Sequence, residues 1–130
     1  MESNATVVVQ SHSNYADTID KLTSAIKNAG ATVFASIDQA AAAKSVGLDL
    51  RPTTLIVWGN PKGGTGLMQA FPLTALDLPM KFVVWDDNGK VNIAYTRASA
   101  IGARYDVTGM DVPIAAMDKG LETLSTAASA

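Results

Sequence analysis

The glycine-rich segment 58–69, with the sequence WGNPKGGTGLMQ, is the part of the chain whose residue types most suggest chemistry. Backbone N–H groups of such a segment after a strand can converge on an anion. A phosphate-binding loop would use Gly59 and Gly64, but the lysine that must follow the second glycine is absent. A dinucleotide fingerprint would use Gly64 and Gly66, but Gln69 stands where the third glycine belongs. The segment is therefore either a tight connection or a ligand-contacting loop without a known nucleotide motif.

A second candidate set consists of four charged residues, Asp38, Arg51, Lys62 and Asp77. Two carboxylates beside a cation are suited to general acid–base catalysis. Each residue also has a structural explanation, because Asp38 suits a helix cap and the others suit turns, ion pairs or solvent. Both explanations stay open at this level. The full set of candidate ligand-binding residues is Arg51, Asn60, Lys62, Gly64, Thr65, Gln69, Asp38 and Asp77.

Metal-dependent and nucleophilic chemistry find little support in the residue types. The chain has no cysteine, and His12 is its only histidine. A metal site would need carboxylates for its other ligands, and none lie at a diagnostic spacing. No G-x-S-x-G motif is present for a serine nucleophile. We therefore expect no metal and no cofactor.

Length and composition indicate one soluble globular domain over residues 1–130. Hydrophobic residues make up 48% of the sequence, charged residues 17%, and the formal net charge is -2. That balance is typical of folded rather than disordered chains. No basic run predicts a nucleic-acid partner, and the apolar run at 7–9 is too short for a signal peptide or a membrane span. The expected location is the cytoplasm, without a membrane partner.

Two amphipathic helices are predicted from apolar residues at helical spacing. The first covers residues 15–29, and the last begins at Asp111, which is expected to cap it. The small-residue tail at 125–130 is expected to fray. Shorter helices are expected at 39–46, 65–71 and 97–105. The methionines expected to pack in the core are Met68, Met80, Met110 and Met117.

Runs of β-branched and aromatic residues predict five strands. They cover residues 5–10, 31–37, 53–58, 80–86 and 90–96. Asn88-Gly89 is the preferred pair for a type I′ turn, so the last two strands form an antiparallel hairpin with Val84 opposite Ile93. The order of elements lacks the strict alternation of a doubly wound parallel sheet. The fold class is therefore α+β, a largely antiparallel sheet of four or five strands covered by helices.

The hairpin face opposite the expected core is more apolar than a solvated face should be. By strand parity it carries Val83, Trp85, Ala94 and Thr96. The strand at 53–58 is expected to add Ile56 and Trp58 to it. Two long helices cover one face of a sheet but not both, so a two-fold related copy would bury the other. We expect a homodimer, with Trp58 and Trp85 as interface candidates.

The middle of the chain resembles the domain-of-unknown-function family 302. The resemblance covers residues 13–105 and rests on an ordered series of motifs: IDQAAAA (37–43), GLDLRPTTL (47–55), GNPKGGTGLMQ (59–69), LDLP (76–79), Trp85 and the hairpin that ends at Tyr95. It implies a small bacterial or archaeal α+β domain of β-α-β4-α type that often forms homodimers. The family carries no established activity to transfer.

One position departs from the family pattern. Gln39 follows Asp38 where members usually have histidine, and glutamine does not titrate near neutral pH. Any role of that histidine as a base or a ligand in relatives is therefore not expected here.

Three functions remain open from the sequence. The first is a dimeric, non-catalytic domain that binds a small polar or anionic ligand at residues 59–66. The second is a purely structural or interaction module. The third is an enzyme that uses Asp38 and Asp77 with Arg51 and Lys62, which the lack of a titrating histidine, a cysteine or a nucleophile motif makes the least favoured.

Overall fold

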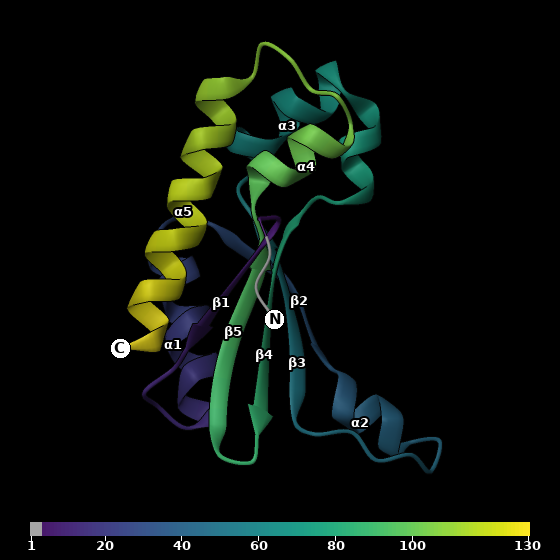
Figure 1. The fold of residues 1–130 in the computed structure, drawn as a ribbon, viewed down its shortest axis with the longest axis vertical. Coiled ribbons are helices and arrows are strands. Elements are labelled where there is room, and N and C mark those ends of the chain that lie inside the picture. Colours follow the sequence, from purple (N-terminus) through teal and green to yellow (C-terminus); the bar gives the residue numbers. More distant parts are fainter. Residues whose placement is uncertain (1–3) are drawn as a thin grey trace.

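The computed structural model describes residues 4–130 and contains one five-stranded sheet (Figure 1). In chain order, the elements are β1 (Thr6–Gln10), α1 (Tyr15–Asn28), β2 (Thr32–Asp38), α2 (Gln39–Lys44), β3 (Thr53–Gly59), α3 (Pro61–Ala70), the 3-10 helix η1 (Pro72–Leu76), β4 (Met80–Asp87), β5 (Lys90–Thr96), α4 (Ala98–Arg104) and α5 (Asp111–Ser129). The strands lie in the order β1-β5-β4-β3-β2, and every neighbouring pair is antiparallel. The predicted α+β class is confirmed.

The β4–β5 hairpin forms as its turn sequence predicts. Asn88 has a φ of 52° and Gly89 a φ of 93°, the positive values that a type I′ turn requires. The Asp86 carboxylate accepts a hydrogen bond from the Gly89 N–H at 2.7 Å. This turn fixes the register, so Val84 lies opposite Ile93, and both side chains are fully buried.

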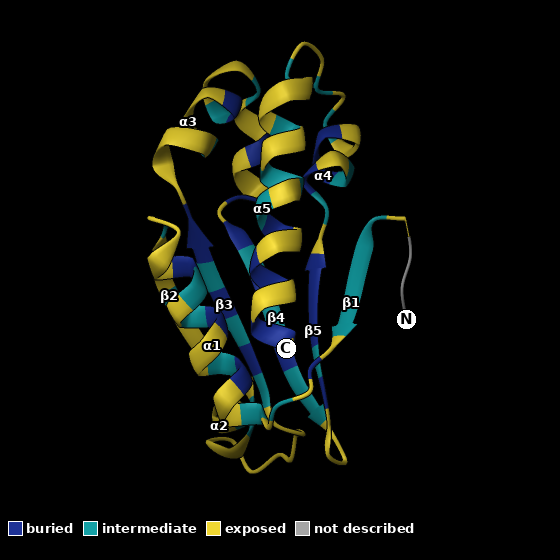
Figure 2. Ribbon diagram, turned by 90° about the vertical axis from the view of Figure 1, so that its left-hand side faces the viewer, coloured by how far each residue is buried: buried dark blue, intermediate teal, exposed yellow. Residues whose placement is uncertain are grey.

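The core lies between the sheet and helices α1 and α5, which cover the same face (Figure 2). The largest fully buried side chains are Phe82, Leu22, Ile26, Ile56, Ile93, Leu121 and Val84. Trp58 stacks on Phe82 with ring centroids 5.4 Å apart, and Phe82 meets Tyr95 edge-on at 5.7 Å. Burial of each such side chain stabilises the fold by about 1.5–3 kcal/mol.

The orientation of β3 is the reverse of the expectation from sequence. Ile56 and Trp58 are buried in the core on the helix-covered face. Leu55 and Val57 therefore lie on the open face, where the neighbouring strand contributes Trp85. The prediction that Ile56 and Trp58 join the open face is wrong, and of the two tryptophans only Trp85 lies on it.

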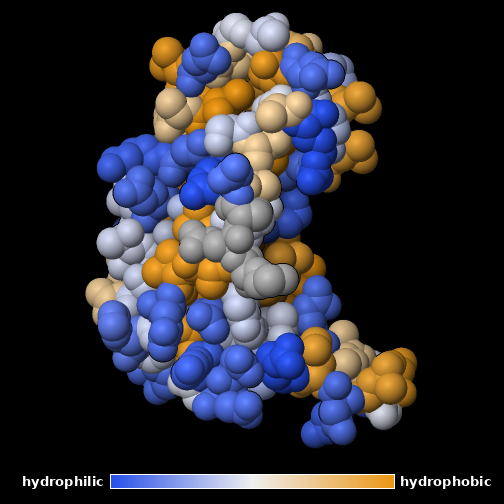
Figure 3. Space-filling view, in the orientation of Figure 1, coloured by the Kyte–Doolittle hydropathy of each residue, from blue (hydrophilic) through white to orange (hydrophobic). Residues whose placement is uncertain are grey.

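The open face of the sheet forms the floor of a concave surface. Helices α3, η1 and α4 gather at one end of the sheet, and α2 projects from the opposite end (Figure 1). No residue of α2 is buried. In the same orientation, the molecular surface is concave between these two ends, on the side away from α1 and α5 (Figure 3).

Helix α5 continues to Ser129, so the prediction of a frayed tail is wrong. Ala128 is fully buried, and the Ser129 carbonyl accepts a hydrogen bond from the His12 N–H at 3.0 Å. The small side chains let the last turn pack closely against its neighbours instead of fraying. Although α5 is 19 residues long, neither it nor any other helix of residues 4–130 is long and apolar enough to cross a membrane.

Candidate functional site

The glycine-rich segment is helical from Pro61, four residues before the helix expected at 65–71, so residues 61–64 are not the loop that their composition suggested. Helix α3 begins at Pro61, whose fixed φ and missing N–H suit the first helical position. Asn60 caps it, with Oδ1 accepting from the Lys62 N–H at 3.0 Å. The N–H groups of Gly63 and Gly64 donate to the Asn60 carbonyl at 2.9 and 3.1 Å. These N–H groups are used within the helix, so they do not form an open anion-binding nest.

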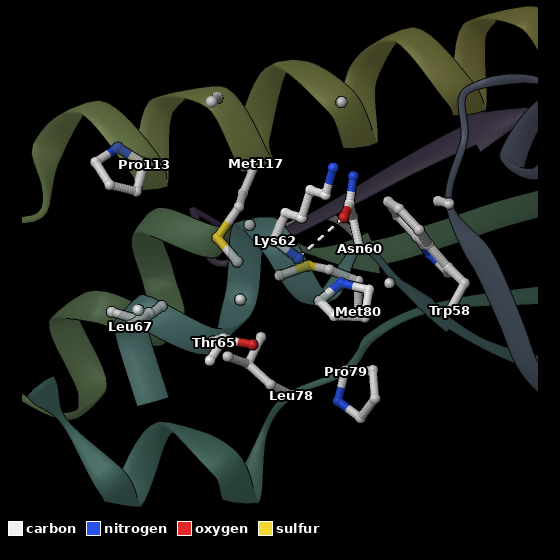
Figure 4. A pocket seen from close by; sticks show the side chains of 18 of the residues that line it. Trp58, Asn60, Lys62, Thr65, Leu67, Leu78, Pro79, Met80, Pro113 and Met117 are labelled. Carbon is white, nitrogen blue, oxygen red and sulfur yellow. Dashed lines mark hydrogen bonds between the residues drawn. The ribbon is translucent and has the colours of Figure 1, made fainter. Parts of the chain in front are cut away.

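A cavity of about 680 Å³ lies between α3, α5 and the adjoining ends of β3 and β4 (Figure 4). Residues 59–68 form one wall, and α5 forms the facing wall, from which Met117 points toward α3. Small-molecule sites in proteins typically have volumes of about 300–1,000 Å³ and mostly apolar walls. The cavity therefore has the dimensions of a ligand site.

The lining combines an apolar surface with positive charge only. Its large apolar side chains include Trp58, Leu67, Met68, Met80, Met110 and Met117. Methionine side chains are flexible and polarizable, so they adapt to ligands of irregular shape. The charged residues of the lining are Lys62 and Lys119, and no Asp or Glu lines the cavity, although the chain has 12 acidic residues.

The two lysines of the lining have no acidic partner. Within residues 4–130, neither Lys62 nor Lys119 takes part in an ion pair. Asp118, beside Lys119 in sequence, instead accepts hydrogen bonds from the N–H groups of Ala98 and Ser99 at 2.6 and 3.3 Å. Its charge therefore caps the start of α4, and the two ammonium groups remain free to meet an anion.

Three glycines of the lining are not required by the backbone or by packing. Gly63, Gly66 and Gly120 lie in helices without a positive φ, and a Cβ added to any of them would meet no atom within 4 Å. By contrast, a Cβ on Gly102 would lie 2.9 Å from Ile114 Cδ1, so close packing of α4 on α5 requires that glycine. Glycine within a helix costs about 0.5–1 kcal/mol relative to alanine. These three positions of the lining thus have room for a side chain that the sequence does not supply, and their glycines lower helix stability.

Trp58 contributes an unsatisfied donor beside the cavity. The side chain is 7% exposed, and its Nε1 is buried with no acceptor among the residues that the structure describes. A buried donor without an acceptor costs about 1–3 kcal/mol. The tryptophan that sequence analysis assigned to a subunit interface is thus a core residue and a cavity-lining residue.

The predicted site residues fall into separate regions. Asn60, Lys62, Gly64 and Thr65 line the cavity, as a site at residues 59–66 requires, whereas Gln69 is exposed outside its lining.

Arg51 and Asp38 lie at the far end of the sheet from this cavity. Arg51 precedes β3 and Asn60 follows it, so about 30 Å of extended chain separates them. Asp38 caps α2 by accepting from the Ala41 N–H at 2.9 Å, and Gln39 is exposed beside it. The structure does not bring the four charged residues of the proposed enzyme site together, and no three His, Cys, Asp or Glu of residues 4–130 are placed to hold a metal ion.

Asp77 belongs to a structural ion pair. Its Oδ2 accepts from the Tyr105 hydroxyl at 2.6 Å and from Arg104 Nη1 at 2.9 Å. The Tyr105 hydrogen bond and the Arg104 charge lower the pKa of Asp77 below its ordinary value of 3.8. The same hydrogen bond raises the pKa of Tyr105. A carboxylate held ionised in this way joins the η1–β4 connection to α4 and is a poor proton acceptor.

The residues that sequence reasoning missed come from α5. Met117, Lys119 and Gly120 face a segment about fifty residues earlier in the chain, and nothing local in the sequence indicates that contact. The start of α3 did carry a signal, because Asn60 followed by Pro61 is a typical helix beginning.

The fold and the cavity define a small α+β domain in which helices cover one face of the sheet. A cavity of ligand size lies at one end of the sheet, between α3 and α5. The chain belongs to the family described as "Domain of unknown function DUF302", whose profile matches residues 7–127. The family match thus extends beyond the stretch 13–105 that carries the resemblance. A crystal structure described as that of an uncharacterized conserved protein DUF302 from Bacillus stearothermophilus has the same fold, with a TM-score of 0.89 at 20% identity over 97% of this chain and 99% of that one.

The curated relatives are longer proteins. A Brucella suis biovar 1 (strain 1330) protein named "Fluoride-specific ion channel FluC 1" is 38% identical over 121 residues, which are 92% of this chain and 48% of that protein. A Brucella abortus biovar 1 (strain 9-941) protein of the same name is 38% identical over 121 residues, 45% of its length. The chain spans about half the length of the curated relatives that it matches.

Proposed function

We propose that this domain is a non-catalytic binding module that holds a small ligand in the cavity between α3 and α5. The observation that carries the proposal is the set of cavity-lining glycines, Gly63, Gly66 and Gly120, which the fold does not require. A fold without a ligand gains stability by placing alanine at such positions. Space that is kept open against that gain is best explained by an occupant.

The chemistry of the walls favours binding over catalysis. The lining contains two titratable side chains, Lys62 and Lys119, and both are exposed. General acid–base catalysis needs groups with pKa values matched to proton transfer, and nucleophilic catalysis needs an activated nucleophile. Neither arrangement is present among the residues that form this cavity.

A thermal-shift screen against a chemically varied panel tests the proposal. The panel contains alcohols, aromatic compounds, carboxylates, phosphates and nucleotides. A ligand present at one hundred times its Kd stabilises the folded protein by about 2.7 kcal/mol, a rise in Tm of roughly 8 °C or more. The variant Gly120→Leu fills the cavity and should lose the shift, whereas Ala115→Leu, exposed on the same helix and outside the lining, should keep it. A hit that Gly120→Leu leaves unchanged, or no hit at all, contradicts the proposal.

The assembly that we propose is a homodimer formed through the open sheet face. Val83 and Trp85 of β4 lie there beside Leu55 and Val57 of β3, and α1 and α5 are both on the other face. Exposed large hydrophobic side chains continue this surface toward the α2 end: Ile37, Val46, Leu48 and Leu50. Contiguous apolar surface of this kind is typical of interfaces, and the projecting α2 of one copy can reach around the other.

Light scattering on the purified protein tests the dimer. The expected mass is twice the 13.5 kDa of one chain. Trp85→Lys places a charge in the centre of the proposed interface and should give monomers, whereas Lys90→Glu at the hairpin turn should not. A wild-type mass of one chain at micromolar concentration contradicts the dimer.

A second candidate function is association with a fluoride channel. The observation that favours it is the 38% identity to half of proteins named as fluoride-specific ion channels. Such a partner would be a separate or fused membrane protein, to which this domain binds. Fluoride efflux from liposomes that contain a purified channel of this kind, with and without the added domain, tests the idea; an unchanged rate and no co-sedimentation contradict it. The cytoplasmic location expected from sequence stays a prediction, which cell fractionation tests.

A further inference from the structure

From the charge and shape of the cavity we infer that its ligand is an amphipathic anion, with an apolar chain or ring and one negatively charged head group. This inference rests on the proposed function and names the chemical class that the site takes. The two parts of such a ligand correspond to the two parts of the lining.

The two lysines of the lining indicate a negatively charged head group. Lys62 is carried by α3 and Lys119 by α5, so the two cations belong to facing walls, and both side chains are exposed at the rim. In Figure 4 the Lys62 side chain extends from α3 toward α5. Two ammonium groups without acidic partners, at the edge of a wall that contains no Asp or Glu, create a positive potential at the mouth. A carboxylate, sulfate or phosphate monoester is attracted there.

The apolar interior of the cavity indicates that the rest of the ligand is apolar. Beyond the lysines, the cavity is lined by Leu67, Met68, Met80, Met110 and Met117, with no charged group among them. A small inorganic anion would leave these walls empty, and a nucleotide would place hydroxyl and amide groups against them without partners. An alkyl or aryl body instead removes the apolar walls from water.

The capping amide of Asn60 adds a donor at the end of β3, next to Lys62. The Asn60 amide uses its Oδ1 for the cap, which leaves its NH₂ group available. Donors without competing acceptors favour an oxygen-rich, negatively charged head over a cationic one. The site thus selects the sign of the charge as well as the apolar body.

Isothermal titration calorimetry with two matched series tests the class. The series are hexanoate, octanoate and decanoate, and the alcohols of the same chain lengths. The inference predicts that affinity for the carboxylates rises about fourfold with each added methylene. It also predicts that each carboxylate binds at least tenfold more tightly than its alcohol, and that this preference weakens as salt concentration rises.

Substitutions separate the two parts of the site. Lys62→Ala and Lys119→Ala are each expected to weaken octanoate binding about three- to tenfold and to leave octanol binding unchanged. Lys44→Ala, at the α2 end of the molecule, should change neither. Gly120→Leu should abolish the binding of both compounds.

The outcomes distinguish this inference from the proposed function. If octanol binds as tightly as octanoate, the lysine variants bind both normally and Gly120→Leu binds neither, then the anionic class is wrong and the cavity remains a ligand site. If octanoate binds equally well to Gly120→Leu, the ligand lies outside the cavity, and both proposals are wrong. If no member of either series binds, the alkyl-anion class is overturned.

Discussion

Gly66 of α3 and Gly120 of α5 offer a direct test of the idea that the cavity is kept open at the expense of stability. Each lies within a helix and has no positive φ, and a Cβ at either position meets no atom within 4 Å. An alanine therefore restricts the unfolded chain and improves helix propensity without a steric penalty. Each substitution should stabilise the protein by about 0.5–1 kcal/mol, and the double variant, in two separate helices, by about 1–2 kcal/mol.

The assay is urea unfolding followed by circular dichroism, with the midpoint and the slope compared between variants. A gain at constant slope is a change in stability, and it corresponds to a rise in Tm of roughly 2–4 °C for each alanine. Gly102→Ala is the matched control. Its new Cβ would lie 2.9 Å from Ile114 Cδ1, so overpacking should cancel the gain or cost about 1–3 kcal/mol.

Two results would refute this reasoning. If Gly66→Ala and Gly120→Ala both destabilise the protein as much as Gly102→Ala, the space beside them is not open. If both alanine variants stabilise the protein but Gly120→Leu leaves ligand affinity unchanged, the open space beside these glycines has no connection with binding.

Three further predictions concern the stability of the fold. Tyr105→Phe removes the shortest hydrogen bond to Asp77 and should lower stability at pH 7. Because that bond lowers the pKa of Asp77, its contribution to stability is present above the ordinary pKa of 3.8 and is lost as the pH falls through the lowered pKa. The stabilities of wild type and variant should therefore converge in acid unfolding. A difference in stability that persists at pH 2 contradicts this. Asp38→Ala removes the cap of α2 and should cost about 0.5–2 kcal/mol without altering ligand affinity, whereas an effect on affinity would link the two ends of the sheet. Leu121→Ala, fully buried in α5, should cost about 2–5 kcal/mol in urea unfolding, and a cost below 1 kcal/mol would place this helix face outside the core.

Local patterns in the sequence were sufficient for much of the fold. The Asn88-Gly89 turn sets the hairpin register through backbone conformations that few other residue pairs adopt. The spacing of Leu22 and Ile26 with their neighbours predicted the buried face of α1. These features depend on residues close together in the chain, so a single sequence reveals them.

The orientation of β3 could not be obtained in this way. Leu55, Ile56, Val57 and Trp58 follow one another, so apolar side chains occur on both faces and alternation gives no preference. Which face meets the helices is decided by pairing with β4, where Ile56 lies opposite the buried Phe82. Trp58 was therefore placed at an interface, although it belongs to the core and the cavity wall.

The candidate site was only half visible in the sequence. Residues 59–66 stand out by composition, but the low helix propensity of glycine concealed the first turn of a helix that begins at Pro61 and not at residue 65. The facing wall comes from α5, and only tertiary packing brings Lys119 into the same lining as Lys62. Arg51 was included as a cation for the two carboxylates, but it precedes β3 and therefore lies at the other end of the sheet.

The central claim, that the cavity between α3 and α5 holds an amphipathic anion, is tested most directly by the amide resonances of the ten glycines during an octanoate titration. Five of them line the cavity: Gly59, Gly63, Gly64, Gly66 and Gly120. The other five lie outside its lining: Gly30, Gly47, Gly89, Gly102 and Gly109. We expect saturable chemical-shift changes in the first group, with Gly47 and Gly89 unmoved at the far end of the molecule. Shifts confined to the second group, or no shift in any glycine at millimolar octanoate, would contradict it.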